Sequence, residues 1–183
     1  MATWISILRG INVSGKRSVK MEALRKSYES LGFQNVVTYV QSGNVIFSTV
    51  NATADTLTEA ITDQIEKDFG FHVTVIVMSS EKLKHIVDNN PFAKDNEKEN
   101  AFLHVTFFAS KPKDVDLEGI TEKARLGEEI SVTEDAVYLY CPGGYGRTRL
   151  NNNFLEKRLQ VRATTRNWKT TNRLLEMTDQ VSE

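Results

Sequence analysis

The side chains best suited to chemistry in this chain are hydrogen-bond donors rather than acids. Four segments combine basic, amide or hydroxyl side chains with glycine or tryptophan and contain no carboxylate: 9–17, 41–44, 143–148 and 165–168. General acid–base catalysis usually needs a histidine, glutamate or aspartate, whereas charged and neutral donors suit the holding of negative charge. These segments therefore predict a site for an anionic, phosphate-bearing ligand such as a nucleotide.

Local context favours the same ligand class. Arg9 begins a loop that is expected to run from a strand to a helix N-terminus, where backbone N–H groups and the helix dipole attract anions. The glycines at 143–146 allow close backbone approach and an anion-binding nest, beside the forked donor Arg147. The hypothesis requires that Arg9, Arg147 and Arg166 gather around one hollow. The predicted ligand-binding residues are Arg9, Asn12, Lys16, Gln41, Ser42, Asn44, Tyr145, Arg147, Arg166, Asn167 and Trp168.

Each of these segments also has a structural interpretation. Gly43 and Asn44 both suit the positive φ angles of a turn between two strands. Thr165 or Asn167 can cap the last helix, and Trp168 can belong to the core.

Other site types find little support. The single cysteine, Cys141, excludes an intramolecular disulfide, and the three histidines His72, His85 and His104 lack metal-ligand spacing. The basic loop after Arg9 lacks the Gly-Lys-Ser/Thr ending of a P-loop. We predict neither a metal nor a cofactor, and the sequence names no catalytic residue.

Three alternative functions remain open. One is an enzyme that acts on a phosphorylated substrate by electrostatic stabilisation alone. Another is a single-stranded nucleic-acid binder that stacks bases on Trp4, Tyr39 and Phe47, which the net charge of −1 does not favour. The third is an adaptor whose segment 114–135, with eight acidic and two basic residues, meets a basic partner.

Location and assembly are only partly constrained. The N-terminus lacks the pattern of a signal peptide, and the longest apolar run, 73–78, is far too short to cross a bilayer. We expect a cytoplasmic protein without membrane partners, and the sequence predicts no oligomeric state.

The hydrophobic pattern predicts an α+β fold of two consecutive ferredoxin-like (β-α-β-β-α-β) halves joined by a linker helix. Residues 1–78 form the first half, 79–100 the linker helix and a loop, and 101–183 the second half with a C-terminal helix. The expected first-half elements are a strand at 3–8, a helix capped by Ser18 and ended by Gly32, strands at 35–40 and 45–49, a helix ended by Gly70, and a strand at 71–78. The expected second-half elements are a strand at 103–109, a helix at 114–126, a hairpin of 129–133 and 136–141, a helix containing Leu150, Phe154 and Leu159, a strand at 160–164 and a helix at 167–177.

Several segments resemble a widespread bacterial domain-of-unknown-function family, DUF1697. The segments are Arg9-Gly10-Ile11-Asn12-Val13 with Gly15, Thr38 to Phe47, Asn90-Pro91-Phe92, and Thr165 to Thr170. The resemblance spans nearly the whole chain and implies a fold of two ferredoxin-like parts, but no established activity. The family often has Gly-Gly after Asn-Val, whereas Ser14 precedes Gly15 here, which implies a slightly less flexible loop.

Overall fold

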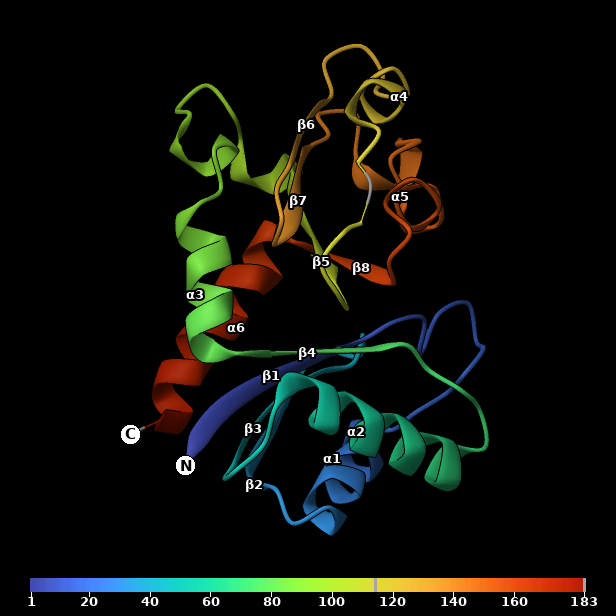
Figure 1. Cartoon of the computed structure of the whole chain (residues 1–183), viewed down its shortest axis with the longest axis vertical. Helices are drawn as coiled ribbons and strands as arrows, with labels where there is room; N and C mark the ends of the chain where they lie inside the picture. The colour runs from blue at the N-terminus through green and yellow to red at the C-terminus, as the bar shows by residue number, and fades with distance from the viewer. Residues whose placement is uncertain (114, 183) are drawn as a thin grey trace. The chain divides into compact units, whose positions relative to one another are not determined.

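The computed structural model describes residues 1–113 and 115–182, which divide into two compact units. The first unit contains residues 1–84 and the chain from Leu174 onward, and the second contains His85–Arg173. Each unit holds one four-stranded antiparallel sheet with helices packed on it (Figure 1). The α+β fold of two ferredoxin-like halves is therefore confirmed.

The first unit is built around strand β1. Its elements are β1 (Ala2–Leu8), α1 (Met21–Ser30), β2 (Gln34–Tyr39), β3 (Asn44–Thr49), α2 (Ala54–Phe69) and β4 (Val75–Ser79). The sheet order is β2-β3-β1-β4, and α1 and α2 lie on one face of it (Figure 1). On that face Leu8 and Phe47 of the sheet pack with Tyr28 of α1 and Ile61 of α2. The buried Tyr28 hydroxyl shares a 2.6 Å hydrogen bond with the Ser6 hydroxyl.

Of two predicted helix ends in the first unit, one is wrong and the other is confirmed. Helix α1 begins at Met21 rather than after Ser18, and its N-cap residue, Lys20, makes no side-chain capping bond. Helix α2 starts with a reciprocal capping box between Thr53 and Thr56 and ends as predicted at Gly70, whose φ is 76°. The Ser18 prediction failed because the loop before α1 is two residues longer than the cap rule assumed.

The second unit repeats the topology. Its elements are β5 (Leu103–Phe108), α4 (Leu117–Thr121), β6 (Glu129–Val132), β7 (Ala136–Tyr140), α5 (Asn152–Leu159) and β8 (Ala163–Asn167). The sheet order is β6-β7-β5-β8, and α4 and α5 lie on one face of it (Figure 1). Between these layers Ile120 packs with Val137, Leu139, Leu155 and Leu159.

Two elements of the second unit differ from expectation. The predicted helix at 114–126 shrinks to the five residues of α4, and Asp114 lies outside the described residues. The last strand runs from Ala163 to Asn167 rather than over 160–164. Gln160 adopts a left-handed conformation at the C-cap of α5, so the chain turns there and the strand starts three residues later.

Two further helices each contain residues of both units. Helix α3 (Ser80–Asp88) begins in the first unit and ends in the second, and α6 (Trp168–Ser182) begins in the second and ends in the first. Short 3-10 turns at Phe92–Lys94, Asn100–Phe102 and Tyr145–Arg147 complete the chain. No helix within the described residues has the length and apolar content that a bilayer span requires.

The close approach of Gly43 to the first-unit core gives a stability prediction. Gly43 has a φ of 82°, and an added Cβ would lie 2.7 Å from Leu8 Cβ and 2.8 Å from Ile11 Cδ1. Because backbone strain and overpacking add, Gly43→Ala should lower the free energy of unfolding by about 2–5 kcal/mol. Gly70→Ala is the matched control, since its φ is 76° but no atom lies within 4 Å. It should cost about 1–2 kcal/mol, and equal losses in urea titrations would contradict the packing argument.

Candidate functional site

The loop of residues 9–20, which we name the basic loop, has an unusual backbone. Residues with φ between 50° and 75° recur along it: Gly10, Asn12, Ser14, Gly15 and Arg17. Each non-glycine residue in this region costs of order 1–3 kcal/mol, and such costs persist only where the surrounding structure fixes the backbone. The loop is therefore held in one specific shape.

The side chain of Asn12 supplies much of that fixation. Its Nδ2 donates to the Val19 carbonyl at 2.9 Å and to the Gln41 carbonyl at 2.8 Å, and its Oδ1 accepts from the Val19 N–H at 2.8 Å. The backbone adds a 3.0 Å bond from Asn12 N to the Arg17 carbonyl. Asn12 thus closes the basic loop and ties it to the turn between β2 and β3.

That turn uses its own polar groups internally. Asn44 is fully buried, and its Nδ2 donates to the Tyr39 carbonyl and to Ser42 Oγ, both at 3.0 Å. Gly43 takes the left-handed conformation as predicted, but Asn44 is the first residue of β3 and Val40 is the second left-handed residue instead. Among the predicted ligand residues of this turn, Gln41 is exposed and Ser42 is half-buried.

The basic loop presents exposed cations. Lys16, Arg17 and Lys20 are exposed, and within residues 1–113 and 115–182 no carboxylate lies at ion-pair distance from any of them. The Arg17 guanidinium lies over the Phe71 ring, 5.9 Å from its centroid, which holds the charge in one direction. Arg9 is half-buried, and its backbone N–H donates to the Thr74 carbonyl at 3.0 Å.

In the second unit, Arg166 lies on strand β8, two residues before the start of α6. Its Nη1 donates to Thr164 Oγ1 at 3.2 Å and to the Thr165 carbonyl at 3.0 Å. Burial lowers the pKa of the guanidinium to about 10, and Tyr145 opposes that shift. The structure therefore brings Tyr145 and Arg166, two of the predicted ligand residues, close to each other.

Tyr145 also contacts His104, one of the three histidines that lack metal-ligand spacing in the sequence. The two rings stack with centroids 4.8 Å apart and planes 22° apart. Burial lowers the pKa of His104, while its contact with the Phe102 carbonyl opposes the shift. The stack joins β5 to the turn at 145–147. The sequence gives no signal for this contact, because the two residues lie 41 positions apart.

The remaining predicted residues have mixed surroundings. Asn167 Oδ1 accepts from the Thr170 N–H at 2.7 Å, which confirms Asn167 as the cap of α6. Thr165 lies in β8 instead, where its hydroxyl bonds to Thr106 and Asn152. Trp168 is buried and Arg147 is exposed. Because Arg9 belongs to the first unit and Arg147 and Arg166 to the second, their convergence on one hollow stays a prediction.

The aromatic platform for nucleic acid is only partly available. Phe47 is fully buried, and its ring stacks on Phe33 with centroids 4.6 Å apart, so it is wrong as a base-stacking candidate. Trp4 packs against the same core. The part of the chain that the structure describes also contains no group of three His, Cys, Asp or Glu side chains placed to hold a metal.

The Asn12 contacts give a second stability prediction. Asn12→Ala removes three hydrogen bonds, so the free energy of unfolding should fall by about 2–3 kcal/mol. Ser14→Ala is the matched control, because Ser14 is exposed and has nearly the same φ, and it should change stability by at most about 0.5 kcal/mol. Urea unfolding of both variants measures the difference. An Asn12→Ala loss as small as that of Ser14→Ala would contradict the role assigned to the amide.

The His104 surroundings predict a pH effect. Because the folded state lowers the pKa of His104 below its ordinary 6.5, the unfolded chain binds the proton more readily. Stability should therefore fall as the pH drops through about 6.5 towards the folded pKa. His104→Gln should show a shallower decline over this range in pH-dependent urea unfolding, and direct NMR titration should place the His104 midpoint below that of a free histidine. Parallel stability curves for the two proteins would contradict this assignment.

Comparison with known proteins places the chain in a family. The family model described as "Protein of unknown function (DUF1697)" matches residues 1–138. No curated protein matches the chain. A solved structure, that of conserved bacterial protein SP0830 from Streptococcus pneumoniae, superposes with a TM-score of 0.72 at 22% identity, covering 97% of this chain and 98% of that one. At this identity the likeness shows a shared fold. The match over residues 1–138 means that the chain belongs to the DUF1697 family of proteins of unknown function.

Proposed function

We propose that the basic loop binds a small anionic, phosphate-bearing ligand such as a nucleotide, and that the protein acts as a binding module. The observation that carries the proposal is the exposure of Lys16, Arg17 and Lys20 without a carboxylate at ion-pair distance in the described ranges. Three like charges on one short loop repel one another, and a bound anion would relieve that repulsion.

Preorganisation supports the proposal. A ligand that orders a flexible loop loses binding free energy to conformational entropy, whereas a loop already fixed by the Asn12 amide avoids this cost. The left-handed turn at Ser14 and Gly15 is closed by a 3.0 Å hydrogen bond from the Lys16 N–H to the Val13 carbonyl. This bond fixes the backbone beside Lys16 and Arg17, so their charges are presented from an ordered turn.

The start of α1 contributes in the same direction. Because Lys20 provides no side-chain cap, the first-turn N–H groups of this ten-residue helix keep the partial positive charge of a helix N-terminus. The acidic residue of that turn, Glu22, is paired with Lys26 at 3.0 Å. Lysine at the N-cap thus adds charge where most helices place a neutral acceptor.

The chemistry of the loop favours binding over catalysis. Residues 9–20 contain no histidine, aspartate or glutamate, so the loop has no group suited to proton transfer near neutral pH. Tyr145, Arg147, Arg166, Asn167 and Trp168 of the second unit belong to the predicted ligand set and stay a prediction. The burial of Phe47 weakens the nucleic-acid alternative.

Calorimetry with defined anions tests the proposal. Inorganic pyrophosphate and a nucleoside diphosphate should bind the wild-type protein, and the affinity should fall as salt rises, since the contacts are ionic. The double variant Lys16→Ala with Arg17→Ala should bind at least about tenfold more weakly, because each charge-assisted contact contributes of order 1–3 kcal/mol. Lys67→Ala, an exposed lysine on α2, is the matched control and should bind like wild type. Absent binding, or equal affinity for all three proteins, would overturn the proposal.

A further inference from the structure

The two edges of the second-unit sheet are finished differently. On the outer side of β8, the Ala163 N–H donates to Glu156 Oε1 at 2.9 Å, and the Thr165 carbonyl accepts from Arg166. The Asn167 carbonyl accepts from Thr171 Oγ1 at 3.0 Å. Side chains therefore occupy backbone groups that would otherwise pair with another strand, which is a common protection of sheet edges.

Strand β6 forms the opposite edge and lacks this protection. Ser131 pairs with Tyr138, and Thr133 N donates to the Ala136 carbonyl at 3.0 Å. In an antiparallel ladder the alternate residues, Ile130 and Val132, then direct their N–H and C=O groups away from β7. Within residues 1–113 and 115–182 none of these four groups has a hydrogen-bond partner.

An apolar groove lies beside this edge. Its volume is about 330 Å³, and its lining consists of Lys111, Pro112, Val115, Leu117, Val132, Thr133 and Glu134. Val115 and Leu117 are 42% and 53% exposed, and Lys111 and Glu134 form a 2.7 Å ion pair at the groove. Ile130 and Val132 have their side chains on the sheet face that carries α4 and α5, so a strand added to β6 would direct alternate side chains to that face.

The surroundings of the groove are acidic. The described residues Val115–Asp135 contain seven acidic and two basic residues. Four of the acids have cationic or imidazole partners from outside the segment, namely Asp116 with Arg158, Glu129 with Lys98, Glu134 with Lys111 and Asp135 with His85.

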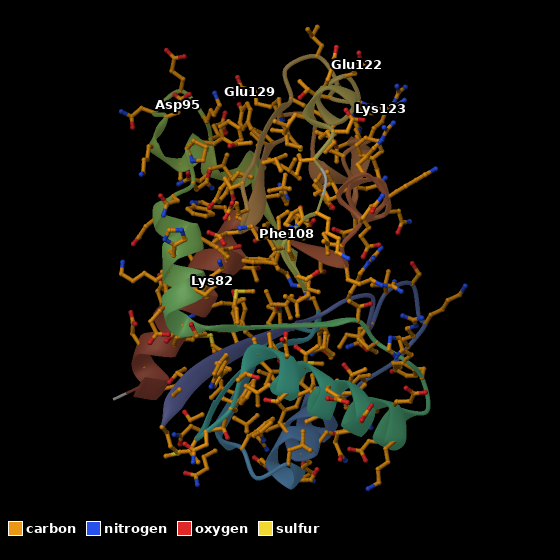
Figure 2. The ribbon with its side chains drawn as sticks, in the orientation of Figure 1. Lys82, Asp95, Phe108, Glu122, Lys123 and Glu129 are labelled. Atoms are coloured by element: carbon orange, nitrogen blue, oxygen red, sulfur yellow. The ribbon has the colours of Figure 1, made fainter. Side chains whose placement is uncertain are left out.

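Three further carboxylates, Glu118, Glu122 and Glu128, have no cation at ion-pair distance among the residues that the structure describes. Figure 2 shows Glu122 near the outer end of α4 and Glu129 at the start of β6. Lys123 and Arg125, the two bases of the segment, likewise have no carboxylate at ion-pair distance among the described residues. The three unpaired acids outnumber these two bases, so the uncompensated charge of the segment is negative, which favours a basic occupant.

We propose that the open edge of β6 and the adjoining groove bind an extended, basic segment of a partner protein by β-strand addition. The partner backbone pairs with Ile130 and Val132, which gives affinity, and alternate side chains give specificity. Residues opposite Ile130 and Val132 are apolar, and those between and beyond them are lysine or arginine. A second copy of this chain is a poor occupant, because β6 paired antiparallel with β6 about Ser131 would place Glu128 opposite Glu134.

The probe is a fluorescein-labelled peptide of alternating valine and lysine, titrated into the full chain and followed by anisotropy and by backbone amide NMR. Binding should move the amide signals of Ile130 and Val132 most. Val132→Pro removes an outward N–H without removing a ladder bond and should weaken binding at least about tenfold, since the lost backbone bonds contribute of order 1 kcal/mol each.

Charge variants test the same proposal if Val132→Pro disturbs folding. Glu118→Lys should weaken peptide binding several-fold, whereas Glu59→Lys on α2, an exposed residue with the same charge change, should leave it unchanged. Absent binding, amide shifts confined to other elements, or equal binding by Glu118→Lys and Glu59→Lys would overturn the proposal, as would dimerisation through β6. Lys16→Ala with Arg17→Ala should leave peptide binding unchanged, so this test is independent of the anion proposal.

Discussion

The arrangement of the basic loop depends on one side-chain amide. Asn12 hydrogen-bonds the Val19 backbone through both its oxygen and its nitrogen, and it reaches the Gln41 carbonyl in the neighbouring turn. These contacts offset much of the strain of the three non-glycine residues in the left-handed region. The Asn12 amide therefore holds the strained backbone of the basic loop in one conformation. As a result, the lysines and the arginine of that loop have defined positions.

The two units use polar side chains for different structural ends. In the first unit, amides close loops: Asn12 fixes the basic loop and Asn44 fixes the turn before β3. In the second unit, side chains finish the edge of a sheet, since Glu156 and Arg166 occupy the outer groups of β8. Arg166 thus has a structural role that is independent of any ligand. Among the described residues, strand β6, at the opposite edge of the same sheet, lacks such side-chain contacts to its outer backbone groups.

The sequence predicted the order of elements well because hydrophobic periodicity and glycine stops are local signals. Gly70 ends α2 as expected, and Asn167 caps α6. Local rules failed at two element boundaries: Ser18 is not the cap of α1, and β8 starts three residues later than predicted because Gln160 takes a left-handed conformation. The residue types of the candidate site could be predicted from the sequence. The hydrogen bonds by which Asn12 fixes the basic loop could not, because its partners lie 7 and 29 positions away. The His104–Tyr145 stack was hidden for the same reason.

The most direct measurement of the central claim is an amide NMR titration of the full chain with inorganic pyrophosphate. If the fixed basic loop is the anion site, the largest shift changes fall on the backbone amides from Gly10 to Lys20, and they vanish in Asn12→Ala under conditions where that variant stays folded. Shifts confined to other segments, or undiminished loop shifts in Asn12→Ala, would contradict the account.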